Sequence, residues 1–364
     1  MPTPGISTIN RQPAANTQGA YWAWMRYARL TKPEENACQA LPSGEIPATI
    51  VQRFSSALIF NLYRHTQQQE LPAKTLMALQ KQSIETTASE MLKHRWLNTF
   101  GEKITEAGIF AALLKSSAFN GWIYPAEAMR HSVDIDLWVT PKAFEQTCRL
   151  MLETHNPVVL GKYRKATHEH LFERVFMPKP GTPGPTVEVH RGLTNPHLYS
   201  VSYSSLLKDS SAHPGFQNTN LRRLSPEKNL LNLALHASRD RNFVGYGTMD
   251  VHELWCKGGV SASRLLELAA EWQAKTPLYF LLLGAKENLD SPIPNTVLNE
   301  LRPKAWRQKL AAATTGVTSS AHSKNQPGRF KQLLSNYALT DSLFNAIKFQ
   351  IDYVAMRIRD IIQH

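Results

Sequence analysis

Three acidic side chains in this chain have the type and spacing for metal chemistry: Asp134, Asp136 and Glu188. The segment 132–139, Ser-Val-Asp-Ile-Asp-Leu-Trp-Val, has the composition of a strand, so Asp134 and Asp136 share one face of it. Two neighbouring carboxylates repel each other and are costly to keep ionised without a cation. With Glu188 from a neighbouring strand, they would form an oxygen-rich site for Mg²⁺, the ion of phosphoryl and nucleotidyl transfer.

A simpler interpretation is that these acids are solvated or paired with surface cations. The flanking residues Ile135 and Leu137 argue against a solvated strand, because apolar backing implies a buried face on which unpaired acids are costly. Glu188 could instead pair with Arg174 or Arg191 across a hairpin. Its place in an apolar strand favours the metal site over that pairing.

Composition indicates an ordinary soluble globular protein whose surface attracts polyanions. The 364 residues are enough for two or three packed units, with 42% hydrophobic and 19% charged residues. The net charge of +12 favours nucleotides, nucleic acid or an acidic partner. Because the basic residues are spread along the chain, we expect one cationic cleft in a solvated surface ahead of a dedicated nucleic-acid groove.

The sequence also predicts a cytoplasmic protein with no membrane partner. No apolar run approaches the roughly 18 residues that span a bilayer. The first residues lack the basic-then-apolar order of a secretory signal. Cys38, Cys148 and Cys256 are scattered without metal-ligand spacing, which is typical of buried thiols in a reducing compartment.

Hydrophobic periodicity predicts an α+β fold: a small mixed β-sheet core flanked by N- and C-terminal helical regions. We expect four parts, namely a flexible arm at 1–20, a helical region at 21–106, an α/β core at 107–222 and a helical domain at 223–364. The expected core strands are 109–114, 133–139, 168–177 and 186–190, with helices at 116–122 and 142–153. The expected outer helices include 50–63, 75–100, 228–238, 261–275, 278–288 and 333–362, with loops at 292–303 and 314–328.

Five motifs in order along the chain suggest a family. They are Leu114-Lys115-Ser116, Arg130 before Asp134-Ile135-Asp136, Val187-Glu188-Val189-His190, Leu224-Ser225-Pro226-Glu227 and Leu235-His236-Ala237. This set resembles the uncharacterised nucleotidyltransferases of the polymerase-beta superfold, from about Gly108 to about Trp255. The helical N-terminal part is also similar to that family's.

The resemblance implies a two-metal mechanism with a nucleoside triphosphate as substrate. Asp134 and Asp136 would hold two Mg²⁺ ions between them, with Mn²⁺ as a substitute, and Glu188 would help to position the catalytic one. Pyrophosphate would leave. Arg130 and Lys115 would neutralise phosphate charge, the first as a planar guanidinium and the second as a point charge.

One position departs from the family pattern. Where the family prefers Gly after Lys115, this chain has Ser116, followed by Ser117. In related folds a Gly-Gly or Gly-Ser element presents backbone N–H groups to the triphosphate. A Cβ at this position could crowd a phosphate or forbid a positive φ angle, whereas the two hydroxyls could donate hydrogen bonds to it.

The resulting functional prediction is Mg²⁺-dependent transfer of a nucleoside monophosphate from an NTP to a hydroxyl of an acceptor. The acceptor is left open between a small molecule, a peptide or protein side chain, and an RNA end, and the charge of +12 favours RNA. The alternative is a catalytically degenerate nucleotide-binding or scaffolding protein, which Ser116 in place of Gly would favour.

Several histidines and one further acid invite weaker hypotheses. His168, His170 and His190 could form a zinc site, but no cysteine joins them, so a nucleotide-facing or structural role ranks higher. His236 lies in an apolar helix and is typical of a core histidine. Asp250 is expected to cap a helix or to pair with a basic residue, and the resemblance implies a supporting role at the site.

Overall fold

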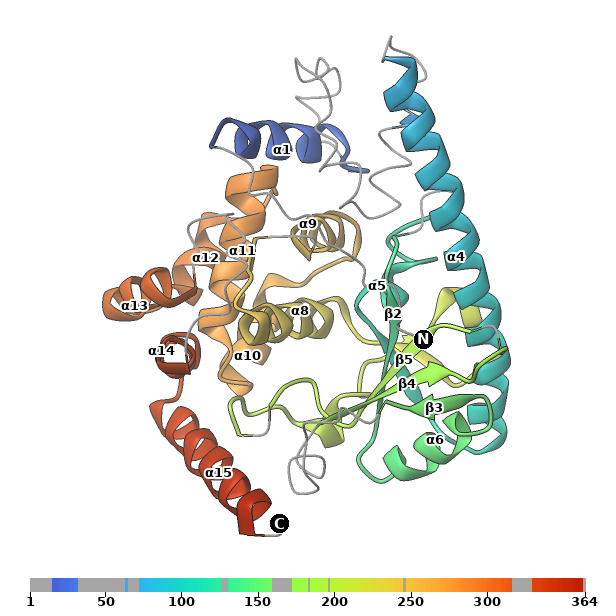
Figure 1. The fold of residues 1–364 in the computed structure, drawn as a ribbon. Coiled ribbons are helices and arrows are strands. Elements are labelled where there is room, and N and C mark those ends of the chain that lie inside the picture. The colour runs from blue at the N-terminus through green and yellow to red at the C-terminus, as the bar shows by residue number, and fades with distance from the viewer. Residues whose placement is uncertain are drawn as a thin grey trace.

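The computed structural model has an α+β architecture in which helices cover both sides of one sheet (Figure 1). This confirms the predicted fold class. The structure describes residues 15–31, 63–64, 72–125, 130–158, 172–182, 184–195, 197–244, 247–315 and 329–362. The predicted helix residues 50–62, strand residues 168–171 and loop residues 316–328 lie outside these ranges.

The sheet has seven strands in the order β3-β4-β5-β2-β1-β7-β6. The β2–β5 and β1–β7 pairs are parallel, and the other four pairs are antiparallel. The strands are β1 (Ala111–Leu114), β2 (Asp134–Val139), β3 (His155–Pro157), β4 (Glu173–Pro178), β5 (Thr186–His190), β6 (Ser211–Ala212) and β7 (Leu221–Arg223).

The strands predicted at 168–177 and 186–190 correspond to β4 and β5, which pair as an antiparallel hairpin across the turn after Pro178. All four residues of β1 are buried, as are the last five of β2. These two strands therefore form the middle of the sheet. The acidic motif lies at the N-terminal end of β2, a nearly fully buried strand.

Two helices cover one side of the sheet, and the C-terminal helices cover the other (Figure 1). The first side has α4 (Ala73–Glu106) and α6 (Phe144–Met151). The short α5 (Lys115–Phe119) follows β1. The remaining helices are α8 (Pro226–Asp240), α9 (Gly247–Lys257), α10 (Ala262–Glu271), α11 (Lys275–Leu289), α12 (Asn295–Leu301), α13 (Ala305–Thr315), α14 (Arg329–Leu339) and α15 (Leu343–Ile362).

Helix α1 (Ala15–Tyr27) packs on the C-terminal helices, far along the sequence from its own position. Trp22 and Trp24 are buried in a small cluster with Met249 of α9 and Leu289 of α11. The aromatic segment after Tyr21 is therefore a packing face. The helix begins at Ala15, inside the segment for which we expected a flexible arm.

The start of α8 matches its sequence signal. The Ser225 hydroxyl accepts a hydrogen bond from the backbone N–H of Lys228, and Pro226 occupies the first helical position. This cap fixes where the helix begins, and its buried residues then extend from Glu227 to Ser238.

Two predictions for the C-terminal region are wrong. Residues 292–303 contain helix α12, because Pro294 and Pro303 flank it without interrupting it and Val297 and Leu301 are buried at helical spacing. The helix predicted over 333–362 is broken between α14 and α15. At the break, the Asp341 carboxylate accepts hydrogen bonds from the backbone N–H groups that open α11.

None of the helices in the described ranges is both long enough and apolar enough to cross a membrane.

A buried histidine should make the folded state sensitive to acid. The His213 Nδ1 accepts a hydrogen bond from Gly215 N at 3.1 Å, and its Nε2 lies 3.2 Å from the Ala118 carbonyl oxygen. Burial lowers the pKa of His213 to about 4. The unfolded chain, with an ordinary pKa near 6.5, therefore binds this proton first as the pH falls, so stability is lost between about pH 6.5 and pH 4.

We predict that His213→Gln removes this contribution. The stability gap is the difference in free energy of unfolding between wild type and the variant. Measured by urea unfolding, this gap should be smaller at pH 5 than at pH 7.5 by about 2 kcal/mol. A gap that stays constant for His213→Gln would contradict the prediction.

Candidate active site

The parallel pairing of β2 with β5 places Asp136 directly opposite Glu188. Directly paired residues on neighbouring strands point to the same face, so the two carboxylates converge. Asp134 lies two residues earlier on that face, opposite Thr186. The prediction that Glu188 comes from a strand adjacent to the acidic pair is therefore confirmed. The alternative pairing with Arg174 is wrong, because Arg174 binds Glu145 of α6 instead.

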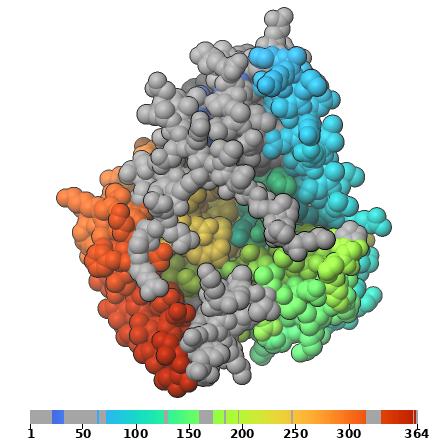
Figure 2. All heavy atoms as spheres, viewed as in Figure 1, coloured from blue at the N-terminus to red at the C-terminus, as the bar shows by residue number. Residues whose placement is uncertain are grey.

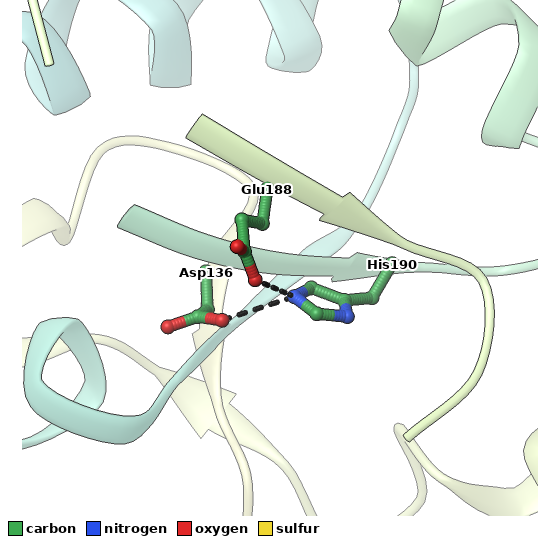
Figure 3. Close-up of side chains that lie close together, drawn as sticks. All are labelled: Asp136, Glu188 and His190. Carbon is green, nitrogen blue, oxygen red and sulfur yellow. Dashed lines mark hydrogen bonds and ion pairs between the residues drawn. The ribbon is translucent and has the colours of Figure 1, made fainter. Parts of the chain in front are cut away.

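Within the described part of the chain, Asp136, Glu188 and His190 form a compact group of potential metal ligands (Figure 3). One ligand atom from each lies within 4.8 Å of the other two. Asp134 lines the same cavity but is outside this compact group. The sequence placed His190 in the motif with Glu188 without a ligand role, and the zinc alternative joined it to His168 and His170, which lie outside the described residues. Its position two residues after Glu188, on the same strand face, is the signal that could have placed it here.

The buried carboxylate of Asp136 is neutralised by two cations. Lys115 Nζ lies 2.7 Å from Asp136 Oδ1, and His190 Nε2 lies 3.0 Å from the same oxygen. Burial alone would raise the pKa of Asp136, but the charge of Lys115 and the hydrogen bond from His190 hold it well below its usual range. The predicted phosphate ligand Lys115 thus contacts an acid in this structure.

His190 contacts carboxylates through both ring nitrogens. Its Nε2 is also 3.4 Å from Glu188 Oε2, and its Nδ1 is 3.3 Å from Glu173 Oε2. Burial opposes charging of the ring, but the hydrogen bonds to Asp136 and Glu188 raise the pKa of His190 to about 9. The ring is therefore an imidazolium at neutral pH, and it ties β5 to β2.

Asp134 has the opposite electrostatic environment. Burial, followed by the charges of Asp136 and Glu188, raises the pKa of Asp134 above its ordinary value, and the charge of Lys115 offsets this only in part. A carboxylate held beside two others at the mouth of a cavity has unbalanced negative potential. A cation would therefore be most favoured next to the Asp134 carboxylate.

Arg239 extends the ion-pair chain to helix α8. Its Nη1 donates to Glu173 Oε2 at 3.0 Å, and its Nη2 lies 3.0 Å from His236 Nδ1. Burial, then the charge of Lys115, lowers the pKa of His236 to about 4, so the ring is neutral. The expected core histidine therefore lines the cavity and orients a guanidinium.

The predicted phosphate ligand Arg130 also lines the cavity, but its guanidinium is held by an acid. Arg130 Nε lies 2.6 Å from Asp250 Oδ1, and the Tyr124 hydroxyl donates to that same oxygen at 2.8 Å. Among the described residues, Asp250 Oδ2 has no hydrogen-bond partner. The prediction that Asp250 pairs with a basic residue is confirmed, and the pair joins the segment before β2 to helix α9.

Glu90, which was not among the predicted site residues, positions the segment that leads into the acidic strand β2. This residue of α4 is 5% exposed and accepts hydrogen bonds from Ser132 N and Asn120 Nδ2, with Lys93 Nζ at 2.8 Å. Burial would raise the pKa of Glu90, but the hydrogen bond from His131 and the charge of Lys93 lower it. No local pattern marks a partner about 40 residues away along the chain.

Ser116 is the position that departs from the family pattern, but the strained backbone conformation lies one residue earlier, at Lys115. Its φ is +50°, a left-handed conformation that favours glycine, whereas Ser116 does not share it. The Cβ of Ser116 therefore causes no backbone strain, because Ser116 does not need a positive φ angle. Ser116 lines the cavity, and Ser117 is buried within the five-residue helix α5.

A cavity of about 650 Å³ lies between the sheet and the C-terminal helices. This size is within the range of small-molecule sites. Figure 2 shows the molecule hollowed at the centre of this face, where yellow atoms of the α8–α9 region lie recessed. The sheet side contributes Lys115, Ser116, Asp134, Asp136 and Glu188 to the lining. The helical side contributes apolar surface from Leu233, Ala237 and Leu281.

The chain was compared with known families and proteins. A family model described as an uncharacterised nucleotidyltransferase matches residues 47–290, about two thirds of the chain. No curated protein and no solved structure gives a significant match. The matched segment contains the whole sheet, helices α8 and α9, and every residue of the acidic cluster. The chain therefore belongs to the uncharacterised nucleotidyltransferase family.

Proposed function

We propose that this protein is a Mg²⁺-dependent nucleotidyltransferase that moves a nucleoside monophosphate from an NTP to an acceptor hydroxyl. The observation that carries the proposal is the in-register pairing of Asp136 with Glu188, beside Asp134, at a cavity of about 650 Å³. Family membership supplies the reaction class. The alternative is a catalytically degenerate protein, which would also bind the nucleotide but would not turn it over.

The donor set fits a hard divalent cation. Asp134, Asp136 and Glu188 offer carboxylate oxygens, which Mg²⁺ and Mn²⁺ prefer. Asp136 is already offset by Lys115 and by His190, but Asp134 is repelled by both of its acidic neighbours. When bound, Mg²⁺ would neutralise phosphate charge and lower the pKa of the attacking hydroxyl.

The side chains around the acids have the chemistry to orient a triphosphate. Lys115 and Ser116 line the cavity beside Asp136, and Arg239 lines it from α8. Together they offer an ammonium, a hydroxyl and a guanidinium to phosphate oxygens. Arg130 is assigned a supporting role, because its pairing with Asp250 holds the segment that leads into β2.

The reaction consists of one displacement at phosphorus. The acceptor oxygen forms a bond to the α-phosphorus, and the bond from that phosphorus to the bridging oxygen of the β-phosphate breaks. The bonding electrons leave with pyrophosphate, and the hydroxyl proton of the acceptor passes to solvent. The net charge of +12 supports RNA as the acceptor, and a steep loss of RNA binding with salt would be its signature.

Turnover should depend on the Asp136 carboxylate. Asp136→Asn should lower pyrophosphate release from Mg-NTP by about 100-fold or more, because it removes the buried charge at the centre of the site. The four common NTPs should be tested with small-molecule, peptide and RNA acceptors. Glu145→Gln is the matched control, because this exposed acid pairs with Arg174 away from the cavity.

Two results would separate the hypotheses. If wild type releases no pyrophosphate but Mg-NTP still raises its melting temperature, and Asp136→Asn abolishes that rise, the protein is a binder without catalysis. If neither turnover nor binding is detected, or if both survive in Asp136→Asn, the assignment of this site is wrong.

Replacing Lys115 should change the affinity for the metal ion and the affinity for the nucleotide in opposite directions. Its ammonium occupies Asp136 Oδ1 and therefore competes with a cation there. Lys115→Met should strengthen binding of Mn²⁺ alone, measured by titration calorimetry, and weaken binding of the NTP by about tenfold. Lys103→Met, which removes a lysine paired with Glu153 outside the cavity, should change neither affinity. A loss of both affinities in Lys115→Met would contradict the competition.

A further inference from the structure

Helix α15 has two apolar faces, and one of them packs on the protein. Ala346 and Met356 are buried, and Phe349 packs against the main core. Asn345 Nδ2 also donates to Gln273 Oε1 at 2.9 Å. These contacts fix which side of α15 faces inward.

The second apolar face points to solvent. It is a stripe in which apolar residues alternate at spacings of three and four, and we call it the outer stripe. Its members are Phe344, Ile347, Ile351, Val354, Ile358 and Ile361, whose exposed fractions run from 47 to 72%. At 3.6 residues per turn, Ile351 and the buried Met356 are about 140° apart around the helix, so the two faces are separate. Figure 2 shows α15, in red, at the lower left edge of the molecule.

We propose that the outer stripe is a self-association surface that binds the same stripe of a second copy of this chain. The spacing carries this assignment. Apolar residues that repeat at alternating intervals of three and four form the seam of a coiled coil, in which each side chain inserts among its equivalents on the facing helix. Such a seam is complementary to itself. The six positions cover nearly the full length of α15.

The extent of the surface agrees with an interaction site. With Leu343 and Ile362 at its ends, the outer stripe brings together eight large apolar side chains, each at least 47% exposed. Single exposed apolar residues are normal on a monomer, whereas a contiguous run of them along a whole helix marks an interaction surface.

The charges of α15 favour a second copy over a lipid surface. Helices that lie on membranes are rich in Lys and Arg on their polar face. Here the basic and acidic residues nearly cancel; they are Lys348, Arg357 and Arg359 against Asp352 and Asp360. Asp352 is, moreover, 3.2 Å from His197 Nε2.

The association is independent of the proposed chemistry. No residue of α14 or α15 lines the cavity that contains the acids. A dimer through the outer stripe therefore leaves the candidate active site as it is, and a failure of one assignment does not bear on the other.

Sedimentation velocity of the full chain, over a wide range of concentration, tests the proposal. Wild type should sediment with twice the mass of one chain and should dissociate on dilution. Ile351→Glu combined with Ile358→Glu should raise the dissociation constant at least about tenfold, because charges would be buried in the seam. Lys348→Glu with Arg359→Glu places the same two new acids outside the stripe of the same helix, and should still dimerise.

The melting curve and circular dichroism of each variant establish that it is folded. If the double Glu variant is misfolded, the milder Ile351→Ser with Ile358→Ser takes its place. Wild type that stays monomeric at every concentration would overturn the proposal, as would a folded stripe variant that dimerises like wild type. Flotation of a monomeric wild type with phosphatidylserine vesicles, lost in the stripe variant, would assign the stripe to a lipid surface and would equally overturn it.

Discussion

The parallel register between β2 and β5 is the constraint on which the candidate site depends. It brings Asp136 opposite Glu188 and puts Asp134 and His190 on the same face. A slip of one residue along either strand would turn one set of side chains to the opposite face and leave no acidic cluster. Ile135 and Leu137, which alternate with the acids along β2, are fully buried on the other side and oppose such a slip. Core packing and site geometry are therefore fixed by the same alternation.

Buried charge is stabilised in this protein by chains of ion pairs that join separate elements. One chain runs from Lys115 through Asp136, His190 and Glu173 to Arg239 on α8. Other pairs tie the segment before β2 to α4, through His131 and Glu90, and to α9, through Arg130 and Asp250. A buried carboxylate that loses its partner is strongly destabilising, so these pairs hold the sheet and the helical layer at a defined separation. The cavity lies at that junction.

Much of the fold follows from local pattern, and the rest depends on long-range partners. Period-two alternation was enough to place Asp134 and Asp136 on one face, and the Ser225-Pro226 signal placed the start of α8. The prolines around α12 led to a wrong prediction of a loop, because a proline that bounds a helix has the same local appearance as one that prevents it. The role of Glu90 could not be predicted, since its partners come from distant parts of the chain. The contacts of His190 with Asp136 and Glu173 could not be predicted, because register is a property of two strands together.

The central claim is that the carboxylates of residues 134, 136 and 188 bind a divalent cation together with a nucleotide. A crystal structure with Mn²⁺ and a non-hydrolysable NTP analogue tests it most directly, because anomalous scattering locates manganese without ambiguity. We expect an anomalous peak at coordination distance from oxygens of Asp134, Asp136 and Glu188, with the ammonium of Lys115 moved from Asp136 to a phosphate oxygen. A structure in which the nucleotide is bound while Lys115 still contacts Asp136, and the metal lies elsewhere, would contradict it.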